Sequence, residues 1–173
     1  RVTKKILERL KYPSKTIEKV VKLVRWHMFF SDTEQITLSA VRRMINNVGR
    51  DNIWDLMDVR ICDRIGTGRP KEDPYRLRKY HSMIEETLRD PLSVSMLKID
   101  GNKIMEVTHV TPGPKIGYTL HALLEEVLDD PSKNTEEYLE NRAKELIVLD
   151  EIELKKLGEE GKKTKEEAEE EKI

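Results

Sequence analysis

The spacing of apolar residues most constrains the fold of this chain, because it follows a helical period along most of the sequence. Two of the clearest periodic segments carry Ile17, Val20, Val21, Val24 and Met28, and Ile116, Leu120, Leu123, Leu124, Val127 and Leu128. Only residues 94–99 could pass for a short strand, and since no partner strand is evident we interpret them as an extended link. The sequence therefore predicts an all-α fold of helical bundle subdomains in series, without a sheet.

Residues typical of helix ends mark the expected boundaries. The predicted N-caps are Ser14, Thr37, Asp100 and either Asn134 or Thr135. Asp73 followed by Pro74 is the usual order at the start of a helix, and Gly49 is predicted to close one in the left-handed conformation. These signals indicate short helices joined by tight turns.

Composition divides the chain into three parts. We expect a helical body over residues 1–90 and a helical tail domain over residues 91–157. Residues 158–173 are mostly charged and have no apolar face to bury, so they are predicted to form a disordered tail.

Charge is unevenly distributed, although the formal net charge is only -1. Lys and Arg outnumber Asp and Glu by 12 to 4 in residues 1–50, whereas the acidic residues prevail by 10 to 5 in residues 101–150. A basic face of this kind can follow a phosphate backbone. The alternative is an ordinary solvated surface, and composition alone leaves both open.

Cysteine content and hydropathy bear on the compartment. The single cysteine, Cys62, cannot form an internal disulfide, which predicts a reducing, cytoplasmic setting. No apolar run approaches the roughly 18 residues that a membrane span requires, so no membrane partner is expected.

A basic loop with the sequence GTGRPKEDP spans residues 66–74. The candidate RNA-binding side chains in and around it are Arg64, Arg69, Lys71, Arg76 and Arg78. Tyr75 and Tyr80 lie among them, and such rings can stack on nucleotide bases. The alternative is a charged loop with two half-buried tyrosines.

Pro112, Gly113 and Pro114 stand directly before a strongly amphipathic helix, with Lys115 and Gly117 in its first turn. The first turn of a helix has N–H donors without internal partners, and its dipole favours an anion. Lys115 adds positive charge, Gly113 lets the backbone approach a ligand, and Gly117 leaves one side of the turn bare. The segment is therefore a candidate phosphate-binding helix start, although prolines also begin structural helices.

The sequence contains no P-loop, no G-x-G-x-x-G segment and no C-x-x-C pair, and it predicts no catalytic residue and no metal ligand. Asp55 and Asp58 share a helix face, but many solvated pairs do so as well, and no second carboxylate cluster matches them. None of the four histidines has the i,i+4 partner of a helical metal site, and His27 is expected at the end of a packed helix.

Residues 100–139 resemble the C-terminal part of bacterial tRNA nucleotidyltransferases, the CCA-adding and poly(A) polymerase family. Members usually carry Gly-Asn/Asp-Asp-Leu-Met, then Pro-Gly-Pro-x-Ile-Gly, then Leu-Leu-Glu-Glu-Val. The matching segments here are Gly101–Met105, Pro112–Gly117 and Leu123–Val127. Lys103 stands where an Asp is common, at a position facing solvent or RNA. Residues 4–28 and 56–70 look like the end of the HD-type region in the same family. The body at residues 1–90 would then correspond to the last part of such a region.

The resemblance implies an all-helical fragment that holds the tRNA elbow, with Asn102 and Lys103 added to the candidate RNA contacts. The family's Gly-Ser and Asp-x-Asp pairs, its Glu-Asp-x-x-Arg and the His-Asp doublet are absent, and only His27 and Asp63 fall where late HD residues would lie. Mg²⁺ and ATP or CTP would then belong to a separate catalytic head, and this chain alone is expected to be inactive. A helical interaction or dimerisation module and a remnant HD phosphohydrolase remain alternatives.

Overall fold

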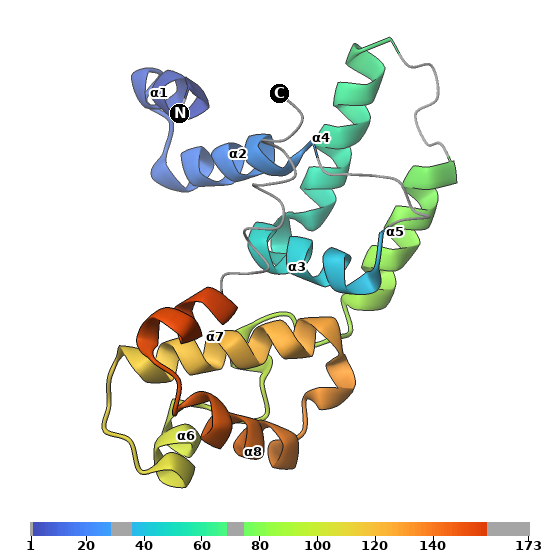
Figure 1. The fold of residues 1–173 in the computed structure, drawn as a ribbon. Helices are drawn as coiled ribbons and strands as arrows, with labels where there is room; N and C mark the ends of the chain where they lie inside the picture. The colour runs from blue at the N-terminus through green and yellow to red at the C-terminus, as the bar shows by residue number, and fades with distance from the viewer. Residues whose placement is uncertain (1, 29–35, 69–74, 159–173) are drawn as a thin grey trace. The chain divides into compact units, whose positions relative to one another are not determined.

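The computed structural model describes residues 2–28, 36–68 and 75–158 (Figure 1). Every regular element within these ranges is helical, and none of their residues lies in a β-strand. The prediction of an all-α fold is therefore confirmed. The chain divides into two compact units, Arg1–Leu88 (unit 1) and Arg89–Ile173 (unit 2). No helix in the described part of the chain is long and apolar enough to cross a membrane.

The described part of unit 1 contains five α-helices and one 3-10 helix. They are α1 (Val2–Arg9), α2 (Ser14–Trp26), α3 (Leu38–Val48), η1 (Arg50–Asn52), α4 (Ile53–Gly66) and α5 (Tyr75–Thr87). Helix α2 packs against α1, α3 and α4, and α3 also packs against α5. The fully buried side chains at the centre of unit 1 come from α3, α4 and α5: Val41, Ile45, Val48, Ile53, Leu56 and Ile84.

Two of the predicted helix ends in unit 1 differ from the expectation. Pro13 occupies the N-cap position of α2, and Ser14 is its first helical residue without a capping hydrogen bond, so the predicted Ser14 cap is wrong. Gly49 has a positive φ of 95°, but its ψ of 138° lies outside the left-handed helical region. The Thr37 cap is confirmed, because Thr37 Oγ1 accepts a hydrogen bond from the Ala40 N–H at 3.2 Å. Asp73 and Pro74 lie outside the described residues.

Unit 2 begins with an irregular segment and continues with helices. Its elements are η2 (Val94–Met96), α6 (Gly101–Thr108), α7 (Pro114–Asp129), η3 (Pro131–Lys133), α8 (Glu136–Leu146) and a last helical stretch over residues 151–158. The link expected to be extended thus contains a 3-10 turn. The side-chain amide of Asn134 holds this link in place, since it accepts from the Lys98 N–H and donates to the Met96 carbonyl, both at 3.0 Å.

The helix starts of unit 2 follow the capping prediction. Asp100 Oδ1 accepts from the Lys103 N–H at 2.9 Å at the start of α6. Thr135 Oγ1 accepts from the Tyr138 N–H at 3.3 Å at the start of α8, so of the two candidates it is Thr135 that caps. A side-chain acceptor at this position satisfies one of the N–H groups that a helix start leaves without a partner.

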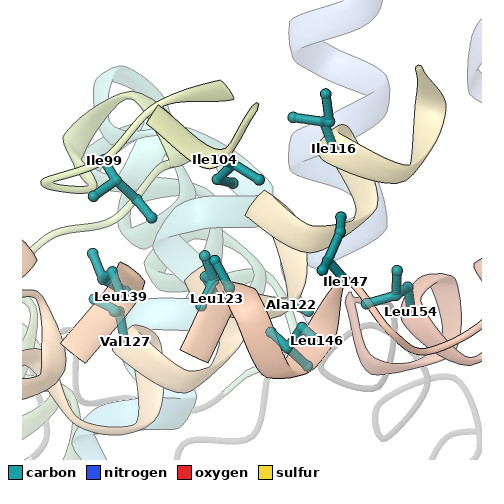
Figure 2. Close-up of a cluster of buried hydrophobic side chains, with 11 residues drawn as sticks. Ile99, Ile104, Ile116, Ala122, Leu123, Val127, Leu139, Leu146, Ile147 and Leu154 are labelled. Carbon is teal, nitrogen blue, oxygen red and sulfur yellow. The ribbon is translucent and has the colours of Figure 1, made fainter. Parts of the chain in front are cut away.

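Helix α7 lies at the centre of unit 2 and packs against α6, η3 and α8. Figure 2 shows buried side chains from α6, α7, α8 and the last helical stretch gathered in one cluster. The cluster consists of Ile99, Ile104, Ile116, Ala122, Leu123, Val127, Leu139, Ala143, Leu146, Ile147 and Leu154. Ile99, from the link before α6, and Leu154, from the last helical stretch, lie outside α6, α7 and α8. The core therefore holds the link and the last helical stretch against α7 as well.

Replacing Leu123 by Ala tests this central role. Leu123 is fully buried in α7, and the change removes buried methyl groups and leaves a cavity, so we expect a loss of about 2–5 kcal/mol in the free energy of unfolding. Urea denaturation followed by circular dichroism measures this loss.

Val148 provides the matched control, because it is also an aliphatic side chain of unit 2 but is 81% exposed. Val148→Ala is expected to change the free energy of unfolding by no more than about 0.5 kcal/mol. Equal losses in the two variants would contradict the assignment of the core.

Candidate nucleic-acid interface

The start of α7 is open to solvent. Thr111, Pro112, Gly113 and Pro114 are all exposed. Gly113 is the N-cap residue, and its φ of -179° and ψ of 174° describe an extended backbone that any residue can adopt. Gly113 is therefore not required here for an unusual φ, and its contribution is the absence of a side chain at the exposed entrance to the helix.

The first turn of α7 offers fewer free N–H donors than the sequence suggested. Pro114 has no N–H, and the Ile116 N–H donates to the Gly113 carbonyl at 3.2 Å. Within the described residues, the N–H groups of Gly113 and Lys115 have no backbone acceptor. A phosphate at this helix start would therefore depend on these two donors and on the Lys115 ammonium group.

Gly117 lies on the exposed side of the same turn. A Cβ atom built on Gly117 would meet no heavy atom within 4 Å. Close packing against the rest of the protein is therefore not the reason for a glycine at this position. None of the ion pairs among the described residues involves Lys115.

The start of α6 lies against the start of α7. A Cβ atom built on Gly101 would be 3.3 Å from Ile116 Cγ2, so the two helices approach closely where a glycine leaves room. Asn102 follows Gly101 and is exposed. The structure thus brings together two of the segments that the sequence resemblance singled out, Gly101–Met105 and Pro112–Gly117.

Lys103 has a different environment from the one expected. Its ammonium group lies 3.2 Å from Glu140, 3.7 Å from Glu136 and 3.7 Å from Glu106. The hydrogen bond to Glu140, together with the charge of Glu106, raises the pKa of Lys103. Lys103 therefore links α6 to α8 through the protein's own carboxylates, and this pairing weakens its candidacy as an RNA contact.

A second polar cluster on α7 and α8 was not predicted. Glu126 accepts hydrogen bonds from the Tyr138 hydroxyl at 2.8 Å and from Arg142 Nε at 2.7 Å, and Arg142 also donates to Glu145 at 2.6 Å. The hydrogen bond to Glu126 raises the pKa of Tyr138, and the same carboxylate raises that of Arg142. No local sequence pattern signals this cluster, because its members come from different helices.

The basic loop of unit 1 is described only at its two ends. Arg64 is partly buried near the end of α4, whereas Arg76 and Arg78 are exposed in α5. Tyr75 is 67% exposed and can still meet a base. Arg69 and Lys71 lie outside the described residues.

Tyr80 cannot serve as a stacking ring, and that prediction is wrong. Its side chain is 3% exposed, and its hydroxyl donates to the Met44 sulfur at 3.1 Å. Burial raises the pKa of Tyr80. The ring belongs to the core of unit 1, on the face of α5 that also carries Leu77 and Ile84.

The residues considered for metal chemistry are engaged elsewhere. His27 Nδ1 lies 2.7 Å from the Val24 carbonyl oxygen, at the end of α2 as expected. Asp63 pairs with Arg60 at 3.3 Å, and Asp55 pairs with Lys19 at 2.7 Å. In the ranges that the structure describes, no group of three or more His, Cys, Asp or Glu side chains could hold a metal ion.

Comparison with known proteins agrees with the resemblance in the sequence. Residues 2–143 match the family described as tRNA nucleotidyltransferase domain 2. The chain is 32% identical over 117 residues to the CC-adding tRNA nucleotidyltransferase of Thermus thermophilus, an alignment that covers 67% of this chain and 25% of that protein. It is 27% identical over 128 residues to the A-adding tRNA nucleotidyltransferase of Deinococcus radiodurans, covering 72% and 28%. No solved structure matches.

The chain spans about a quarter of the length of these two curated relatives. The resemblance to tRNA nucleotidyltransferases is nevertheless confirmed, since the family match extends over residues 2–143, which is most of the chain. This protein therefore belongs to the tRNA nucleotidyltransferase domain 2 family.

Proposed function

We propose that this chain binds tRNA and positions its elbow while a separate catalytic head adds nucleotides to the 3′ end. The observation that carries the proposal is the exposed start of α7, where Lys115 and the bare surface at Gly117 lie beside the start of α6. Membership of a tRNA nucleotidyltransferase family supports RNA as the ligand.

Binding of this kind requires shape and charge rather than a catalytic constellation. Double-stranded RNA is recognised mainly through its phosphates and 2′-hydroxyl groups, because side chains cannot read its deep, narrow groove. An open helix start with a lysine can contact one phosphate, and exposed arginines such as Arg76 can contact others. Asn102 can donate to a hydroxyl or a phosphate from the neighbouring helix start.

Nucleotide addition is assigned to the head. The sequence contains neither the Gly-Ser nor the Asp-x-Asp pairs with which the family holds two metal ions. Mg²⁺ and ATP or CTP would accordingly be bound by the head and not by this chain.

The purified chain is expected to add no nucleotide to tRNA. The test is incubation with tRNA lacking its 3′ end, labelled ATP or CTP and Mg²⁺, followed by measurement of label in the RNA. Incorporation above the level without protein would contradict the assignment of catalysis to a separate head, because two-metal transfer needs carboxylates that converge on one point.

Gly117→Leu is expected to weaken tRNA binding without weakening the fold. The leucine side chain would project into open space and obstruct the helix start. Leucine also favours a helix over glycine, so the free energy of unfolding should hold or rise by roughly 0.5 kcal/mol. Fluorescence anisotropy of labelled tRNA and thermal unfolding measure the two quantities.

Gly117→Ala is the matched control. It brings the same gain in helix propensity with a much smaller side chain, so its affinity for tRNA should lie between those of the unaltered chain and Gly117→Leu. Full affinity in both variants would show that the α7 start makes no contact with RNA. A loss of stability would contradict the open environment of Gly117.

A further inference from the structure

Helix α2 carries a row of exposed lysines. Lys15, Lys19 and Lys22 follow the spacing i, i+4 and i+7, which places them on one face. All three are exposed, whereas Ile17 on the opposite side of the helix is buried, and the buried Leu23 borders the row next to Lys19. At a rise of about 1.5 Å per residue, the row extends roughly 10 Å along the helix.

Most of this charge has no ion-pair partner among the residues that the structure describes. Lys19 pairs with Asp55 at 2.7 Å. None of the ion pairs among the described residues involves Lys11, Lys15 or Lys22. Lys11 is exposed at the corner between α1 and α2, where its φ is 58°, a few residues before Lys15 in the sequence.

Helix stability does not account for the lysine at the start of α2. Lys15 lies in the first turn, which contains no acidic residue. A cation at this end opposes the helix dipole, so Lys15 is electrostatically unfavourable for the helix itself. An external anion would remove this conflict.

The charge of the two units differs in sign. Unit 1 contains 19 Lys and Arg against 12 Asp and Glu, and unit 2 contains 13 against 21. The net charges are therefore +7 and -8. A polyanion is attracted to unit 1 as a whole and repelled by unit 2, so the main electrostatic contacts are expected on unit 1.

We propose that Lys11, Lys15 and Lys22, together with Lys19, form an RNA phosphate-binding surface on α2. This inference rests on the proposed tRNA-binding function. It assigns the main electrostatic contribution to tRNA binding to unit 1, as a surface distinct from the start of α7. Lysines on flexible stems neutralise phosphates without reading sequence, so this surface contributes affinity for any tRNA.

The test compares two triple variants of the full chain. The first carries Lys11→Gln, Lys15→Gln and Lys22→Gln. The control carries Lys144→Gln, Lys155→Gln and Lys156→Gln, three exposed lysines of unit 2 that change the net charge equally. Affinity for tRNA is measured by anisotropy between about 50 and 200 mM salt, the range over which phosphate contacts dominate. Circular dichroism establishes that both variants are folded.

The α2 variant is expected to bind at least about tenfold more weakly at roughly 100 mM salt, and its plot of log affinity against log salt should be shallower by about two to three. The control is expected to stay within about twofold, with an unchanged slope. If both variants lose affinity equally, overall charge and not the α2 surface is responsible, and the inference is wrong.

Unchanged affinity in the α2 variant would overturn only this inference. The proposed function would still be supported, because the unaltered chain would still bind tRNA. Absence of tRNA binding by the unaltered chain would overturn the proposed function and the inference with it. Loss of folding in the α2 variant would show that the three lysines support the helix, which contradicts the unfavourable position assigned to Lys15.

Discussion

Burial of one face of α7 is the packing interaction on which the rest of unit 2 depends. Its side chains from Ile116 to Leu128 meet α6, α8 and the last helical stretch in a single cluster. The same burial leaves the other face of the first turn, with Gly117, open. Since the first turn is continuous with the buried part of the helix, the core also fixes the position of Lys115. A rigid element that presents a few exposed groups is the arrangement that a binding site on a helical scaffold requires.

The polar groups of the protein divide into those used internally and those left for a partner. Lys103 and Arg142 are cations within unit 2, but carboxylates on α7 and α8 engage both of them. Such exposed or half-exposed pairs contribute little to stability individually, yet they determine which cations are available to an anion. In unit 1 the lysines of α2 are exposed, and only Lys19 among them has a carboxylate partner among the described residues. The proposed RNA binding would therefore depend on unpaired charge as much as on total charge.

Local patterns in the sequence predicted the parts of the fold that local physics controls. Apolar periodicity gave the all-α class, and capping residues such as Asp100 and Thr37 marked helix starts correctly, because both effects act within one or two turns. Tyr80 was misassigned because its environment is set by Met44, which lies 36 residues away. The pairing of Glu126 with Arg142 escaped prediction for the same reason, with 16 residues between the partners. The sequence alone pointed to Pro112–Gly117 as a candidate site. The small number of free N–H donors there became evident only from the hydrogen bonds in the structure.

The central claim is that this chain binds tRNA through its phosphates without a catalytic head. The most direct test is the affinity of the unaltered chain for several different tRNAs as a function of salt concentration. The account predicts similar affinities for all of them and a linear fall of log affinity with log salt, with a slope that corresponds to several phosphate contacts. Affinity that is absent at low salt, or that does not change with salt, would contradict it.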